Sequence, residues 1–171
     1  DLGIKFYDRD LVDEIIKEVG IPTDIMDRVE EGGTIAGKGA QGDVRGSFSK
    51  YADLTDRAIH VQKQIIRKLA QKEACVIIGR SADYILKDRD DVLNVFIHGD
   101  TPEKIQRIRQ IYHVSEKDAV KMMEDTDKRR MTNYNFYTEQ KWGKASNYTL
   151  CLNTSQLGYD RCEKIIMECL E

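Results

Sequence analysis

The chain has 171 residues, of which 40% are apolar and 33% are charged, and its net charge is −3. These values are typical of a single globular domain, residues 1–171, with one hydrophobic core. They argue against a general nucleic-acid or membrane surface, so any anion site must come from a local cluster of cations. No run of about 18 apolar residues and no signal peptide is found, which favours a cytoplasmic protein without a membrane or nucleic acid polymer as partner.

The first elements alternate between strand and helix patterns. Residues 4–8 (IKFYD) predict a short strand, and residues 9–19 (RDLVDEIIKEV) predict a helix. Residues 51–72 predict a long amphipathic helix, because apolar residues recur every three or four positions on one side. That apolar stripe comprises Leu54, Ala58, Val61, Ile65 and Leu69.

A glycine-rich stretch, residues 31–50, precedes this long helix. It contains Gly32, Gly37 and Lys38 at the spacing of the phosphate-binding motif G-x-x-x-x-G-K-[S/T], but position 39 is Gly, which has no hydroxyl for Mg²⁺. No strand pattern leads into the motif, and glycines follow where the motif needs a helix. We therefore interpret residues 31–50 as a flexible surface loop and not as a triphosphate site.

Three further segments predict strands. Residues 74–79 (ACVIIG) and 92–99 (VLNVFIHG) are continuous apolar runs, as expected for strands buried on both faces of a parallel sheet. Residues 148–153 (YTLCLN) are the third segment. Strands that alternate with helices indicate an α/β fold, here a parallel sheet with helices on both faces.

The intervening helices have recognisable starts. Thr101, as capping residue before Pro102, predicts one helix start. Ser115-Glu-Lys-Asp118 resembles a capping box and predicts the next. A last helix is predicted from an apolar face that comprises Tyr159, Cys162, Ile166 and Cys169.

Neither the cysteines nor the histidines have metal-ligand spacing. No C-x-x-C occurs, and the three histidines are scattered along the chain. We therefore predict no structural metal, and buried free thiols at all four cysteines, which are Cys75, Cys151, Cys162 and Cys169.

Charged residues follow the first two predicted strands. The first strand runs into Asp8-Arg9-Asp10, and the second ends in Gly79-Arg80-Ser81. Ligands of doubly wound folds bind at the carboxyl ends of strands, and a guanidinium binds phosphate oxygens in a bidentate manner. The two arginines therefore favour a phosphate ligand, with a surface ion pair as the alternative for each.

The densest charge cluster lies at residues 125–130 and comprises Asp125, Asp127, Lys128, Arg129 and Arg130. Asp127 and Arg130 are three positions apart on one helix face, where the carboxylate can accept from a hydroxyl and the guanidinium can donate to a phosphate. The alternative is a solvated helix end. Aromatic residues interleaved with basic ones follow, and they would suit single-stranded nucleic acid, but the acidic chain argues against such a partner.

Four segments together resemble the cytidylate kinase-like branch of the P-loop nucleoside monophosphate kinases. They are GIKFYDRDLVDEI, CVIIGRSADYIL, TDKRRMTNYNFYTEQKWGKASNY and LCLNTSQLG. The resemblance extends over nearly the whole chain except residues 31–50. It implies a P-loop kinase-like fold and transfer of the γ-phosphoryl group from ATP, with Mg²⁺, to a nucleoside monophosphate.

The resemblance also implies roles for individual residues. Arg80 matches the arginine that holds the acceptor phosphate, Asp127 the lid acid near the ribose, and Arg130 the lid arginine on the phosphates. Residues 125–146 would form this lid. Lys128 and Arg129 would share the catalytic cationic field, and Asp8 and Arg9 would belong to the substrate-binding residues.

The chain departs from the family pattern at two places. Ser81 stands where cytidylate kinases carry Asp, and Asp8-Arg9-Asp10 stands where Asp-Thr-Gly is usual. A CMP-like acceptor is favoured, but these departures leave the base open, and the oligomeric state is open as well.

The family also has a strand, a phosphate loop and a helix before the segment that resembles residues 2–8. A central phosphate-loop strand is therefore expected upstream of residue 1, and without it the sheet would have a gap and the 171-residue chain alone would lack its triphosphate site. Two alternatives stay open, a P-loop kinase for another small-molecule acceptor and a catalytically silent nucleotide-binding or interaction module.

Overall fold

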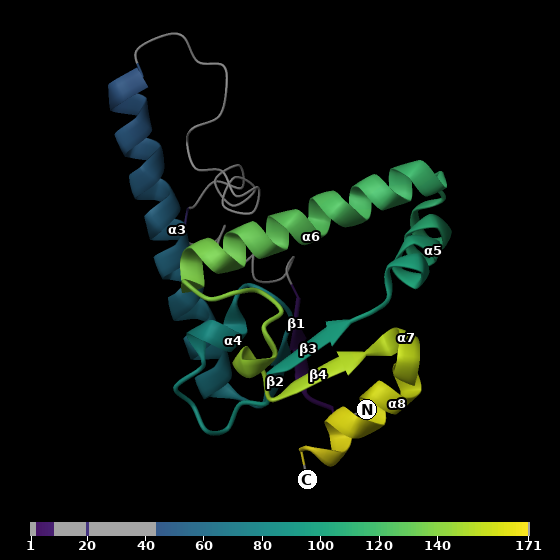
Figure 1. Ribbon diagram of the computed structural model, residues 1–171. Coiled ribbons are helices and arrows are strands. Elements are labelled where there is room, and N and C mark those ends of the chain that lie inside the picture. The colour runs from purple at the N-terminus through teal and green to yellow at the C-terminus, as the bar shows by residue number, and fades with distance from the viewer. Residues whose placement is uncertain (1–2, 9–19, 21–43, 171) are drawn as a thin grey trace. The chain divides into compact units, whose positions relative to one another are not determined.

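The computed structural model describes residues 3–8, 20 and 44–170 of the chain, with the side chains of residues 44–55 left out of the description (Figure 1). The chain divides into two compact units, Asp1–Asp88 and Arg89–Glu171, and each is described by itself. The helix predicted at residues 9–19, Arg9 included, lies outside the described residues. So does the glycine-rich segment up to residue 43, with its near-motif.

The first unit contains two strands and two helices: β1 (Lys5–Tyr7), α3 (Val44–Lys72), β2 (Cys75–Ile77) and α4 (Ala82–Ile85). The two strands pair in parallel, with Tyr7 opposite Ile77. Residues 44–50, which the sequence analysis assigned to the glycine-rich loop, are the first turns of α3. One internal glycine costs a helix only about 1 kcal/mol, which a helix of this length can tolerate.

The core of the first unit lies between α3 and one face of the strand pair. Tyr7 of β1 and Ala58 of α3 are buried, and the partly buried apolar residues packed against them are Val61, Ile65, Leu69, Cys75 and Ile77. This arrangement confirms the apolar stripe predicted for α3 from Ala58 onward.

The opposite face of β1 and β2 carries exposed apolar side chains. Phe6 is 51% exposed, Val76 42% and the following Ile78 53%. The described residues therefore cover the second strand on one face only, and the prediction of burial on both faces is not met by them. A continuous apolar run indicates that both faces need cover, but it does not identify the covering element.

The second unit contains two strands and a series of helices. Its elements are β3 (Val95–His98), α5 (Thr101–Tyr112), α6 (Glu116–Thr138), the 3-10 helix η1 (Ala145–Asn147), β4 (Leu150–Asn153), α7 (Thr154–Leu157) and α8 (Tyr159–Glu168). Figure 1 shows β3 and β4 side by side, and they pair in parallel with His98 opposite Asn153. Long α6 follows α5 directly and contacts it.

The pairing of the strands is parallel within each of the two units, as predicted. Among the described residues there are two separate strand pairs, β1 with β2 and β3 with β4, in place of one four-stranded sheet.

The helix starts in the second unit agree with the sequence in part. Ser115 caps α6, because its Oγ accepts a hydrogen bond from the Asp118 N–H at 3.2 Å and donates to Asp118 Oδ2 at 2.6 Å. The cap of α5 is Asp100, one residue before the predicted Thr101, and Pro102 lies in the first turn. No described helix is long and apolar enough to cross a membrane.

The prediction of buried thiols holds for one cysteine in full. Cys162 is buried and Cys75 is half-buried, but Cys151 and Cys169 are exposed. Cys151 alternates along β4 with the buried Leu152, so the two point to opposite faces. Cys169 lies at the end of α8, where no further turn of helix covers it.

Candidate functional site

Arg80 lies at the carboxyl end of β2, as predicted, in a turn with an unusual backbone. Gly79, Arg80 and Ser81 have φ angles of 74°, 57° and 51°. A left-handed conformation costs a residue other than glycine about 1–2 kcal/mol. The Arg80 carbonyl accepts a hydrogen bond from Gln62 Nε2 at 3.2 Å, and the Ala82 N–H donates to the Gly79 carbonyl at 3.1 Å. The backbone that carries Arg80 is therefore held by α3 and by the first turn of α4. Strain of this kind concentrates at ligand sites.

The other residue that follows a strand in the first unit is Asp8, which is half-buried directly after β1. Because β1 and β2 are parallel and in register, Asp8 and the turn that contains Arg80 follow the same edge of the strand pair. The position of Arg9 is not described. Two of the three strand-end residues named from the sequence, Asp8 and Arg80, thus follow strands of this pair.

The charge cluster of the second unit lies on α6 and centres on Asp127. Lys104 Nζ lies 2.5 Å from Asp127 Oδ2, and Arg130 Nη1 lies 3.8 Å from Asp127 Oδ1. The contact between Asp127 and Arg130 confirms that the two residues share a helix face. Arg129 donates to Thr126 Oγ1 at 3.2 Å, and Lys128 is exposed. Asp127 thus has a cation beside each oxygen.

Lys104 was not identified from the sequence. It lies in the first turns of α5, and its ion pair joins residues 23 positions apart on two helices. Helix spacing rules predict pairs within one helix only. No sequence signal could therefore have connected Lys104 with Asp127.

A second polar group joins the carboxyl ends of β3 and β4. Asp100 Oδ1 accepts from Asn153 Nδ2 at 3.0 Å, Asp100 Oδ2 accepts from Gln156 Nε2 at 2.9 Å, and the Asp100 N–H donates to Ser155 Oγ at 2.7 Å. The hydrogen bonds from Asn153 and then Gln156 lower the pKa of Asp100 below its usual value. A Cβ added to Gly99 would lie 3.1 Å from Ser155 Oγ, so the two loops approach closely there. This network, which the sequence analysis did not predict, fixes the two strand ends to each other.

The predicted lid, residues 125–146, divides into a helical and a packed part. Its first part belongs to α6, which ends at Thr138 and is followed by the capping residue Glu139 with a φ of 57°. Beyond it, the Trp142 ring lies edge-on to the Phe96 ring of β3, with 5.4 Å between the ring centroids. The centroid of the Tyr148 ring lies 4.9 Å from that of Phe96. These two aromatic side chains pack inside the second unit. They are therefore not part of an exposed basic and aromatic surface of the kind that binds nucleic acid.

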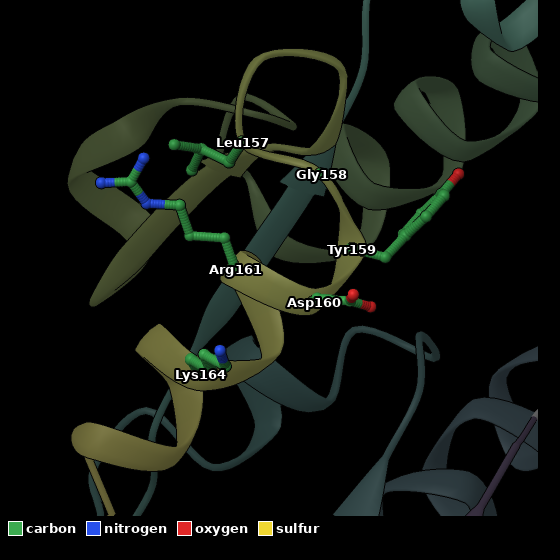
Figure 2. A pocket seen from close by; sticks show the side chains of 6 residues that line it. All are labelled: Leu157, Gly158, Tyr159, Asp160, Arg161 and Lys164. Carbon is green, nitrogen blue, oxygen red and sulfur yellow. The ribbon is translucent and has the colours of Figure 1, made fainter.

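A shallow hollow lies at the start of α8, and Figure 2 shows the side chains around it. Its lining residues are Leu157, Gly158, Tyr159, Asp160, Arg161 and Lys164. The ring of Tyr159 and the guanidinium of Arg161 point away from each other in this view. A ligand site needs polar groups that converge, and no residue of the predicted site lines this hollow, so we assign no ligand to it.

A Mg²⁺ ion needs oxygen ligands that converge, and the described residues provide no such cluster. No group of three His, Cys, Asp or Glu side chains among them could hold a metal ion. In phosphoryl-transfer enzymes Mg²⁺ is bound largely by substrate phosphates and water. The described residues by themselves thus form no Mg²⁺ site.

The parallel strand pairs, the arginine at a strand end and the acid–cation cluster on a helix define an α/β protein with side chains suited to phosphate. The family model of the cytidylate kinase-like family matches residues 1–156. The chain therefore belongs to the cytidylate kinase-like family.

One solved structure similar to the chain is an uncharacterized protein from Eubacterium ventriosum ATCC 27560. The two are 31% identical with a TM-score of 0.72, over 98% of this chain and 83% of the other. None of the curated proteins matches the chain.

Proposed function

We propose that the protein transfers the γ-phosphoryl group of ATP to a nucleoside monophosphate, with a CMP-like acceptor favoured. A phosphate oxygen of the monophosphate would form a new bond to the γ-phosphorus, and the bond from that phosphorus to the β,γ-bridging oxygen would break. The products are ADP and a nucleoside diphosphate. The family membership of the chain supports the reaction class.

The observation that carries the proposal is the pair of Asp127 and Arg130 on α6. Arg130 is 64% exposed at its side chain, so its guanidinium can reach a phosphate, while Asp127 lies beside it on the same face. Arg130 would stabilise the charge that develops on the transferred group, and exposed Lys128 and Arg129 would add to that positive field. Asp127 would accept a hydrogen bond from a sugar hydroxyl of the acceptor.

Residues at the strand ends of the first unit would hold the acceptor. Arg80 would bind its phosphate in ground and transition states alike, from a backbone that the turn holds in place. Asp8 and Arg9 would contribute to the same substrate. No general base is needed, because phosphoryl transfer depends mainly on positioning and on positive charge. When bound with ATP, Mg²⁺ would neutralise part of the charge of the triphosphate.

We also propose that the α6 part of the lid closes over bound nucleotide and excludes water. Residues 142–148, of which Trp142 and Tyr148 contact the Phe96 ring, would stay in place. We expect added nucleotides to slow amide hydrogen exchange in residues 125–138 more than in residues 142–148. Equal exchange of residues 125–138 with and without nucleotides would contradict a lid.

The function is tested with the full-length protein, ATP and Mg²⁺, and an acceptor panel of CMP, UMP, dCMP and AMP. We expect ADP and one nucleoside diphosphate to form in equal amounts, with a cytosine acceptor used best. Turnover of a different acceptor alone would keep the reaction class and correct the substrate. No diphosphate from any of the four would contradict the proposal.

A further inference from the structure

Lys104 connects the end of β3 with the charged face of α6. Its backbone N–H donates to the Asp100 carbonyl at 3.0 Å, which places it in the first hydrogen-bonded turn of α5. The stem of the side chain passes Gly99, where an added Cβ would lie 3.8 Å from Lys104 Cγ. The ammonium group then contacts Asp127 Oδ2 at 2.5 Å. The backbone of Lys104 is thus anchored next to the strand end that the Asp100 network holds, and its ammonium group lies at the proposed site.

The two oxygens of Asp127 have different partners. Oδ2 accepts directly from Lys104, whereas Oδ1 lies 3.8 Å from Arg130, which is too long for a hydrogen bond. A carboxylate offers about four lone-pair sites, so Oδ1 keeps capacity for a further donor. The Lys104 and Asp127 side chains are 35% and 33% exposed, and a pair covered to this extent is screened less than one on the open surface.

We propose that Lys104 is a positioning residue, which holds Asp127 by Oδ2 and thereby directs Oδ1 to a sugar hydroxyl of the monophosphate. The inference rests on the proposed function, in which Asp127 binds the acceptor. A carboxylate held at one oxygen loses its rotational freedom before the substrate arrives, so less entropy is lost on binding. Lys104 itself touches neither substrate nor reacting atoms.

A purely structural role for Lys104 makes a different prediction. If the ion pair only fastens α5 to α6, its loss lowers the melting temperature but leaves the Michaelis constant of the folded protein unchanged. A positioning role changes the Michaelis constant for the acceptor while kcat stays near the wild-type value, because the interaction is formed in ground and transition states alike.

The test compares Lys104→Met, Lys104→Gln and Lys104→Arg with wild-type full-length protein, with folding checked by circular dichroism. Lys121→Met is the matched control, because Lys121 is an exposed lysine of α6 outside the Asp127 cluster. For Lys104→Met and Lys104→Gln we expect the KM for CMP to rise about tenfold, with kcat within about threefold, from the loss of one charge-assisted hydrogen bond. Lys104→Arg should restore KM, because it keeps the charge. The Gln variant keeps a polar end without the charge, and it provides the comparison if the Met variant does not fold.

The outcomes separate this inference from the function on which it rests. If the wild-type protein phosphorylates CMP and the neutral variants match Lys121→Met in KM, the positioning role is wrong and the proposed function stands. If the neutral variants only melt earlier, the role of Lys104 is structural. If the wild-type protein phosphorylates no nucleoside monophosphate, the proposed function is wrong and the inference is overturned with it.

Discussion

The carboxyl ends of β2 and β3 are held by different means. At β2 the backbone supplies the structure: three consecutive residues, Gly79, Arg80 and Ser81, have positive φ, and Gln62 binds a main-chain carbonyl. At β3 the side chains supply it, because Asp100 is bound by Asn153, Gln156 and the hydroxyl of Ser155. Because the backbone fixes the turn at β2, replacement of the Arg80 side chain should change the stability of the protein little. At β3, loss of any side chain of the Asp100 network should lower the stability of the protein.

The same contrast extends to the two arginines proposed for phosphate binding. Arg80 stands on the backbone-held turn of the first unit, whereas Arg130 stands on α6, whose Asp127 is held by Lys104 of α5. The first is suited to constant binding of one phosphate. The second stands on a helix whose Asp127 forms an ion pair with Lys104 of α5, and in the proposed reaction it would meet charge only during transfer.

The largest expected effect concerns these arginines in the full-length protein. Arg130→Ala should lower kcat by on the order of 10³, by analogy with other arginines that stabilise a transferred phosphoryl group. Arg80→Ala should mainly raise the KM for the monophosphate, because its contact is the same in ground and transition states. Steady-state kinetics with CMP measure both.

Arg161→Ala is the control for these variants, because Arg161 is an exposed arginine of the second unit outside the proposed site. If Arg130→Ala keeps kcat and kcat/KM within about twofold, which corresponds to less than ~0.5 kcal/mol, the assignment of Arg130 is wrong. The Asp127 cluster would then be a solvated helix face.

Gly99→Ala should destabilise the β3 end. The new Cβ would lie 3.1 Å from Ser155 Oγ and 3.3 Å from Thr154 Oγ1, and a shift of Ser155 weakens its bond to the Asp100 N–H. We expect a loss of about 1 kcal/mol in the free energy of unfolding, larger than the loss from Arg80→Ala. Denaturant titrations measure both.

A double-mutant cycle with Ser155→Ala identifies the cause of that loss. Because this substitution removes the oxygen that the new Cβ approaches, the cost of Gly99→Ala should shrink in its presence. An unchanged cost would show that the close approach of the two loops is not the reason.

The stability of the second unit should depend on pH through Asp100. Its folded pKa is lowered by Asn153 and Gln156, so its contribution to stability is present above the unfolded value of about 3.9 and is lost as the pH falls through the folded value. Asp100→Asn should therefore lower the melting temperature at pH 7 and have a smaller effect at pH 3, which is below the unfolded pKa. Thermal unfolding at both pH values checks this. Asp90→Asn, at an exposed position, should show no such difference.

The smallest expected effect is at the β2 end. Ser81 caps α4 without a side-chain hydrogen bond, so its hydroxyl contributes little, whereas its φ of 51° is unfavourable for any residue with a Cβ. Ser81→Gly should stabilise the protein by about 0.5 kcal/mol, the relief of strain less the extra chain entropy of glycine. A clear destabilisation in a denaturant titration would mean that the Ser81 side chain, and not the backbone, holds this turn.

Much of the local structure could be predicted from the sequence, because it depends on neighbouring residues. The strand segments, the apolar stripe of α3 from Ala58 to Leu69 and the cap at Ser115 follow from periodicity and hydrogen bonds within a few positions. The contact between Asp127 and Arg130 follows from the helical repeat.

The remaining features depend on packing between distant segments. The pair of Lys104 and Asp127 requires α5 and α6 to meet, and the Asp100 network joins residues 53 or more positions apart. The positive φ values at Arg80 and Ser81 could not be predicted from the sequence either, because a positive φ is expected mainly at glycine. Exposure of Phe6 could not be foreseen, because an apolar strand pattern does not reveal which face receives a cover.

The central claim, that the protein moves a phosphoryl group to a monophosphate, is tested most directly by following the γ-phosphate itself. Full-length protein is incubated with CMP and with ATP whose γ-phosphate is labelled with oxygen-18. The labelled phosphate is then located by phosphorus nuclear magnetic resonance. The account predicts the label in the β-phosphate of CDP, with loss of this signal in Arg130→Ala and not in Arg161→Ala. Label found only in inorganic phosphate or retained in ATP, across CMP, UMP, dCMP and AMP, would contradict it.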